Sequence, residues 1–96
     1  MREVKWTNPA LLDFEEIQNH IGLDNPTAAK RVTNRVREAA DGLCRHPFSG
    51  RSIRGSQVRI RVVSGTPYLI VYRVTTAVEV LRLWHARRNW IIFQAE

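Results

Sequence analysis

The chain of 96 residues contains only one cysteine, five glycines and four prolines. The lone thiol, Cys44, excludes an internal disulfide bond and a cysteine cluster that would hold zinc. The histidines at positions 20, 46 and 85 do not share one helical turn, and we expect no metal and no cofactor. Residues 50–55 begin and end with glycine but lack the lysine and hydroxyl residue of a phosphate-binding loop.

Long apolar runs are also missing. The longest strongly apolar run, residues 68–72, is far too short to cross a bilayer, and the charged first residues are unlike a secretory signal. We therefore expect a cytoplasmic protein without membrane contact. A hydrophobic content of 44% and a charged content of 25% are typical of a folded protein, and the length predicts one domain over residues 1–96.

Acidic residues are scarce in the second half of the chain. Residues 45–96 carry nine arginines and two acidic residues, a net charge of +7, whereas residues 1–44 carry six basic and seven acidic residues. The excess charge of +6 therefore lies entirely in the second half. Such an imbalance favours an anionic partner, either an acidic protein segment or a nucleic acid.

Two helices are predicted in the first half, after a short strand at residues 3–6. Each begins with a capping side chain followed closely by proline, at Thr7 and at Asn25. We expect the first helix to end at residues 22–24 and to carry Asp13 on its solvent-facing side. The short break between the helices predicts an antiparallel hairpin. Apolar residues at spacings of three and four give each helix one buried stripe: positions 10, 14, 17 and 21, and positions 29, 32, 36, 40 and 43.

Three strands are predicted in the second half, at residues 57–63, 68–74 and 78–84, after a loop at 45–56. The strand at 68–74 is apolar on nearly both faces, which is typical of a central strand. The order of elements is β-α-α-β-β-β, followed by a short tail at residues 91–96. It predicts an α+β fold in which a small, mainly antiparallel sheet packs against the helical hairpin.

Arginines alternate with apolar residues along the first of these three strands. Since side chains alternate between the two faces of a strand, Arg59 and Arg61 project from one face, opposite Val58, Ile60 and Val62. We expect the arginine face to look outward and to contact an anionic partner. The alternative is a solvated face that protects an edge strand from aggregation.

Several short motifs occur in an order that resembles the RelE/ParE toxins of bacterial type II toxin–antitoxin systems. The resemblance spans residues 3–90. The motifs are Trp6-Thr-x-x-Ala10, Asn25-Pro-x-Ala-Ala29, Pro47-x-x-Gly-Arg51, Pro67-Tyr-Leu-Ile-Val-Tyr-Arg73 and Val80-Leu-Arg-Leu-Trp-His85-Ala-Arg-Arg88.

The resemblance implies a partner and a site. The partner is an antitoxin with an acidic, amphipathic C-terminal segment that covers the sheet and the helical hairpin in a hetero-oligomeric complex. The residues that we expect to contact antitoxin or target are Arg59, Arg61, Arg73, Arg82, His85, Arg87, Arg88 and Trp90.

The family divides by target, and the sequence favours the ParE-like branch, which poisons DNA gyrase. The alternative is a RelE-like, ribosome-dependent mRNA endoribonuclease, in which His85 transfers protons while Arg59, Arg61 and Arg88 hold phosphate. Arginine is a poor proton donor because it stays charged above pH 12. The chain also has Leu69 where RelE has a further arginine, and no tyrosine follows Tyr72 to match the functional C-terminal tyrosine of RelE. A nucleic-acid binder is the third possibility.

Overall fold

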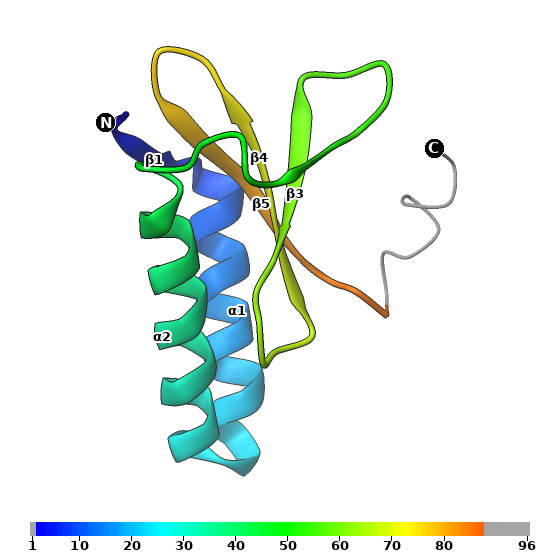
Figure 1. Cartoon of the computed structure of the whole chain (residues 1–96). Helices are drawn as coiled ribbons and strands as arrows, with labels where there is room; N and C mark the ends of the chain where they lie inside the picture. The colour runs from blue at the N-terminus through cyan, green and yellow to red at the C-terminus, as the bar shows by residue number, and fades with distance from the viewer. Residues whose placement is uncertain (1, 88–96) are drawn as a thin grey trace.

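The computed structural model describes residues 2–87, which form two helices and a five-stranded sheet (Figure 1). The predicted α+β fold with a helical hairpin is confirmed. The elements are β1 (Val4–Trp6), α1 (Asn8–Asp24), α2 (Pro26–Gly42), β2 (Arg51–Ser52), β3 (Val58–Val62), β4 (Tyr68–Val74) and β5 (Val78–His85).

Both helices begin at the caps that the sequence predicts. The Thr7 side chain accepts a hydrogen bond from the N–H of Ala10, and the Asn25 side chain accepts one from the N–H of Ala28. α1 ends at Asp24, within the predicted range of 22–24, but residues 22–24 are themselves helical and do not form a break. A glycine inside a helix costs only about 1 kcal/mol relative to alanine. The helix therefore passes through Gly22 and stops where the next cap begins.

The sheet has the strand order β1-β5-β4-β3-β2. β1 runs parallel to β5, and the other neighbours are antiparallel. The central position predicted for residues 68–74 is confirmed, because β4 lies between β5 and β3. β2 lies inside the predicted loop at 45–56 and pairs with Ile60 and Arg59. Two residues are too few to show an alternating pattern, so this strand has no recognisable signal in the sequence.

The helical hairpin covers one face of the sheet, with α1 against β5 and α2 against β4 (Figure 1). The main core lies between these layers and takes alternate residues from β4 and β5, including Tyr68, Ile70, Tyr72, Val78, Val80 and Leu83. A second, smaller cluster lies on the opposite face. It comprises Ile60, Leu69 and Val71, with Ile53, Val58 and Trp84 packed against it. β4 is therefore buried on both faces, which explains its almost continuous apolar sequence.

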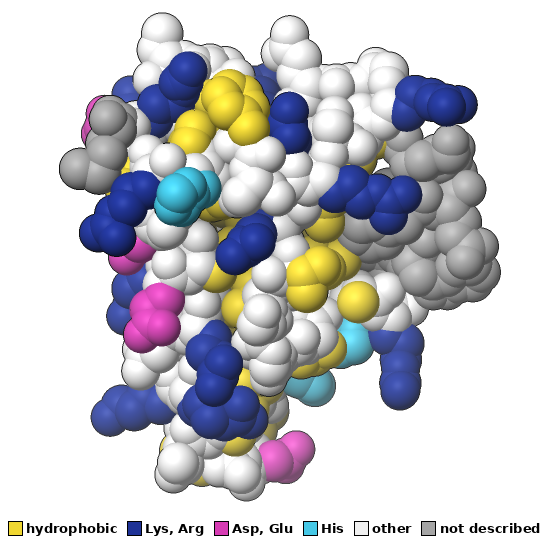
Figure 2. Space-filling view, in the orientation of Figure 1, with side chains coloured by type: hydrophobic (Ala, Val, Ile, Leu, Met, Phe, Trp, Pro, Cys, Tyr) yellow, Lys and Arg dark blue, Asp and Glu magenta, His cyan; other side chains and the backbone are white. Residues whose placement is uncertain are grey.

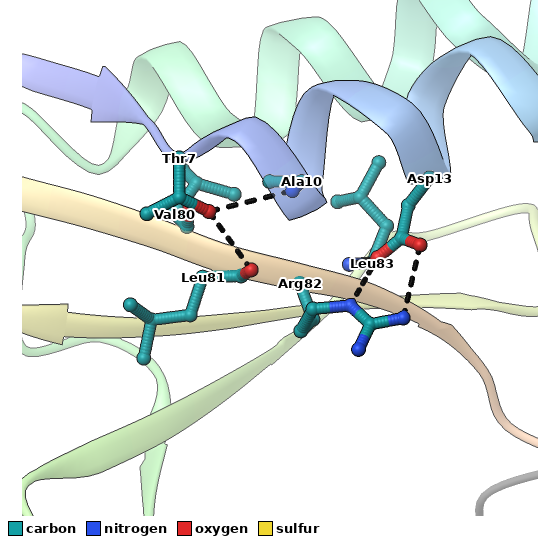
Figure 3. A network of polar contacts seen from close by, with 7 residues as sticks. All are labelled: Thr7, Ala10, Asp13, Val80, Leu81, Arg82 and Leu83. Atoms are coloured by element: carbon teal, nitrogen blue, oxygen red, sulfur yellow. Dashed lines mark hydrogen bonds and ion pairs between the residues drawn. The ribbon is translucent and has the colours of Figure 1, made fainter.

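α1 also completes the edge of β5 beyond the short strand β1 (Figure 3). The Thr7 hydroxyl lies 3.0 Å from the carbonyl oxygens of both Val80 and Leu81, to which it can donate, and the Thr7 N–H donates to Val80 at 3.0 Å. Farther along the helix, Asp13 accepts a hydrogen bond from the Leu83 N–H at 3.0 Å. The first turns of α1 thus occupy hydrogen-bonding positions that a longer β1 would have filled.

Candidate interaction surface

The register of the strands decides which face of the sheet carries the predicted arginines. Arg59 lies opposite Tyr72, and Arg61 lies opposite Ile70. Tyr72 and Ile70 belong to the core under the helices. Arg59 and Arg61 therefore share one face, as predicted, but it is the face that the helices cover. The arginine face is therefore not the open side of the sheet, which the apolar side chain of Ile60 takes. Arg61 is nevertheless exposed to solvent, whereas Arg59 is half-buried.

Two different environments exist along β3 because neither helix lies directly over it. α1 packs on β5 and α2 on β4, and β3 lies farther across the sheet (Figure 1). Near Arg59 the helix-side surface of β3 is occupied by the chain that leads from α2 to β2. Near Arg61 it borders a recess beside α2.

Arg59 is held by the fold. Its Nη1 donates hydrogen bonds to the carbonyl oxygens of Phe48, at 3.3 Å, and Gly50, at 2.9 Å. Its guanidinium also lies 5.0 Å from the centroid of the Phe48 ring, and the Arg2 guanidinium lies 5.5 Å from the same centroid. A guanidinium engaged in this way stabilises the loop and has fewer donors left for a phosphate.

His85 lies on the same face of the sheet as Arg59 and Arg61, because it pairs with Tyr68. The two rings meet edge to face with centroids 5.3 Å apart, and His85 Nδ1 accepts a hydrogen bond from the Arg87 N–H at 3.1 Å. β4 lies between His85 on β5 and the two arginines on β3. The backbones of β5 and β3 are therefore about 10 Å apart, which is two strand spacings.

By strand register Arg73 and Arg82 belong to the other face of the sheet, although the Arg82 guanidinium reaches Asp13 of α1 at the edge of β5. Arg73 lies opposite Val58 and Glu79 and forms an ion pair with Glu79. Arg82 lies opposite Val71 and binds both carboxylate oxygens of Asp13, at 2.7 and 3.1 Å (Figure 3). The hydrogen bonds to Asp13 raise the pKa of the Arg82 guanidinium, against a smaller opposing effect of desolvation.

Asp13 has a structural role that the sequence did not reveal. We expected it on the solvent-facing side of α1, but its side chain is only 13% exposed and contacts the edge of β5. A single carboxylate beside an apolar stripe has the same sequence pattern whether it faces water or an adjacent strand. The pairing with Arg82, 69 residues away, depends on the tertiary fold.

The predicted site residues therefore do not form one cluster. Arg59, Arg61 and His85 share one face, whereas Arg73 and Arg82 lie on the other. Arg87 is exposed just beyond β5. Arg88, Trp90 and the tail at 91–96 lie outside the described residues. Figure 2 shows lysine and arginine side chains spread over the visible face, with hydrophobic side chains between them.

Within residues 2–87, no three His, Cys, Asp or Glu side chains come together in a way that could hold a metal ion. Neither of the two helices has the length and apolar character needed to span a bilayer.

Residues 4–90 match the family model described as the ParE toxin of the type II toxin–antitoxin system parDE. The chain belongs to this family. The resemblance inferred from the sequence motifs is thereby confirmed, and the protein is a toxin of the ParE/RelE type.

Two relatives and one solved structure extend this result. The chain is 39% identical to the Y4kP protein of Sinorhizobium fredii over 93% of each chain. It is 38% identical to the toxin RelE2 of Caulobacter vibrioides, over 92% of this chain and 99% of the relative. A chain from the chromosomal ParDE system of P. aeruginosa superposes with a TM-score of 0.79 at 24% identity and covers 88% of this chain and 96% of the other, which shows a shared fold.

Proposed function

We propose that this toxin inhibits growth by poisoning DNA gyrase and that a cognate antitoxin neutralises it by direct binding in the cytoplasm. The family model is that of ParE, and one matching structure comes from a ParDE system. The relative RelE2 carries the name of the other branch, so the choice between gyrase and mRNA rests on the geometry of the candidate residues.

The proposal rests on one observation: the guanidinium of Arg59 is already hydrogen-bonded within the protein. Cleavage of RNA needs a proton-transfer group close to cations that hold the phosphate in the transition state. Here the Arg59 guanidinium donates to the carbonyls of Phe48 and Gly50. His85 stacks edge-on to Tyr68, with β4 between it and Arg59. Among the described residues this arrangement supports a binding surface better than a nuclease centre.

The charge distribution supports an acidic protein partner. The net charge of +6 and the arginines of the second half would attract an acidic antitoxin segment and speed its association. Exposed apolar side chains on α1, at Leu11, Leu12 and Leu23, are available to its apolar residues. We therefore expect a complex in which both kinds of contact contribute.

Induced expression in bacterial cells tests this function. If the toxin acts on gyrase, a reporter plasmid loses negative supercoils soon after induction, while reporter mRNA remains intact. Co-expression of the antitoxin restores both growth and supercoiling. Early cleavage of mRNA with unchanged plasmid topology would contradict the proposal.

The second candidate is the RelE-like endoribonuclease, and two observations favour it. One relative is named RelE2, and His85 shares a face with Arg61, whose guanidinium makes no hydrogen bond or ion pair with another residue in the range 2–87. In that case His85→Ala abolishes toxicity but leaves antitoxin binding unchanged. A fully toxic His85→Ala variant would exclude this mechanism.

A further inference from the structure

A recess of about 240 Å³ lies between α2 and the end of β3. One wall comes from α2 and the other from β3 and the turn that follows it. Its lining residues are Arg35, Glu38 and Ala39 on the helix, and Arg61, Val62, Val63 and Ser64 on the strand side. Nothing in the gyrase proposal assigns a role to this recess.

Arg35 is fixed at one end of the recess. Its Nη1 donates a hydrogen bond to the carbonyl of Ser64 at 3.3 Å. The next residue, Gly65, has a φ of +77°, and a Cβ built there would lie 3.0 Å from the same nitrogen. The turn therefore passes directly beneath the guanidinium. Because this group has five N–H donors, others remain for a ligand.

Arg61 supplies the second cation. It is exposed and lies on the helix-side face of β3, opposite Ile70. Within residues 2–87 the ion pairs are Arg73–Glu79 and Arg82–Asp13, so Glu38 neutralises neither Arg35 nor Arg61 by direct pairing. The recess thus holds two guanidinium groups and one carboxylate, an excess of one positive charge.

The lining combines this charge with apolar surface. The half-buried Ala39 on α2 and the buried Val63 supply the apolar part of the lining. Val62 also borders the recess, but its side chain belongs to the opposite face of the sheet because it pairs with Leu69. A glutamate or aspartate on an amphipathic peptide fits both properties, because guanidinium groups bind carboxylates through paired hydrogen bonds. The Glu38 carboxylate repels any anion, but the repulsion is larger for the closely spaced charges of a nucleic-acid backbone than for a single carboxylate.

We propose that this recess binds an acidic side chain of a protein partner, with Arg35 and Arg61 as its ligands and Ala39 as the adjacent apolar contact. Only the identity of the partner, the antitoxin, rests on the proposed function. The carboxylate specificity rests on the recess itself.

The first test needs no antitoxin. The side-chain Nε–H signals of the arginines are followed by NMR while the toxin is titrated with propionate, a small carboxylate with an aliphatic end. We expect saturable shifts at Arg35 and Arg61, loss of the Arg35 shift in Arg61→Gln, and little change at the exposed Arg54. Equal, non-saturating shifts at all three arginines would overturn the proposal.

The second test measures binding of the antitoxin, identified as the product of the adjacent gene that suppresses toxicity. Titration calorimetry compares the pair Arg35→Glu and Arg61→Glu with the matched pair Arg51→Glu and Arg54→Glu. The second pair makes the same change in net charge at exposed positions around β2. We expect roughly 30-fold weaker binding for the recess pair and about threefold for the control pair. Thermal unfolding verifies that each variant is folded, and glutamine variants replace any that is not.

The outcomes separate the two proposals. Equal weakening by both pairs would indicate long-range attraction alone and would overturn the recess as a site. Loss of binding to a short DNA duplex, with antitoxin binding unchanged, would overturn it in favour of a phosphate site. If wild-type toxin binds no antitoxin but still shows the propionate shifts, the proposed function fails and the carboxylate site stands.

Discussion

The hydroxyl of Tyr72 accepts a hydrogen bond from the backbone N–H of Gly50 at 2.8 Å and lies 2.8 Å from the carbonyl oxygen of Pro47, to which it donates. Tyr72 is completely buried in the central strand β4. One side chain thus satisfies two backbone groups of the connection between α2 and β2. This contact ties the loop to the core and gives Arg59 its carbonyl partners.

Tyr72→Phe tests the contribution of that hydroxyl. The ring still fills the core, but the N–H of Gly50 and the carbonyl of Pro47 lose their partner. We expect the free energy of unfolding to fall by about 1–3 kcal/mol, because a buried polar group without a partner costs that much. Urea unfolding measures the change. A variant as stable as the wild type would show that water replaces the hydroxyl without cost.

Gly50→Ala tests how closely the loop approaches Tyr72. A Cβ at Gly50 would lie 2.4 Å from the Tyr72 hydroxyl and 2.9 Å from the carbonyl oxygen of Ile60, so the backbone must shift. We expect a destabilisation of about 1–3 kcal/mol from overpacking. Gly42→Ala is the matched control, because a Cβ there meets nothing within 4 Å at the end of α2. Equal melting temperatures of the two variants would contradict the close approach.

Asp13→Ala should destabilise the edge of β5. It leaves the Leu83 N–H without its acceptor and removes the ion pair with Arg82. We expect a loss of about 1–3 kcal/mol. Arg82→Ala is the control and should cost less than about 1 kcal/mol, because its side chain is half exposed. Similar losses in both variants would show that the ion pair, and not the backbone contact, dominates.

The two arginines of β3 should differ in how much they contribute to the stability of the fold. Arg59→Ala removes two hydrogen bonds to carbonyl groups and the contact with Phe48, and we expect about 1–3 kcal/mol of lost stability. Arg61→Ala should change stability by no more than about 0.5 kcal/mol, because its side chain is exposed. Differential scanning calorimetry compares the two. The reverse order would place the structural arginine at position 61.

Local sequence signals predicted most of the fold. The caps at Thr7 and Asn25 set where the helices begin. The apolar residues on both faces of β4 predicted its central position in the sheet. These features depend on neighbours in the sequence. β2 was missed because two residues carry no periodic pattern.

The face of the candidate site could not be predicted in the same way. Alternation places Arg59 and Arg61 together, but the side of the sheet on which they lie depends on the register with β4. The apolar partners Val58 and Ile60 look like a core face, and they do face a core, the smaller one opposite the helices. The engagement of Arg59 also requires the loop at Phe48 and Gly50, whose path the sequence does not specify.

Supercoiling by purified gyrase tests the gyrase proposal most directly. Relaxed plasmid, gyrase and ATP are incubated with increasing amounts of the purified 96-residue toxin, and the topoisomers are separated by electrophoresis. We predict that supercoiling stops at near-stoichiometric toxin, that added antitoxin restores it, and that His85→Ala inhibits as well as the wild type. Undiminished supercoiling at a large excess of folded toxin, with mRNA cleaved in a translating extract, would contradict the account.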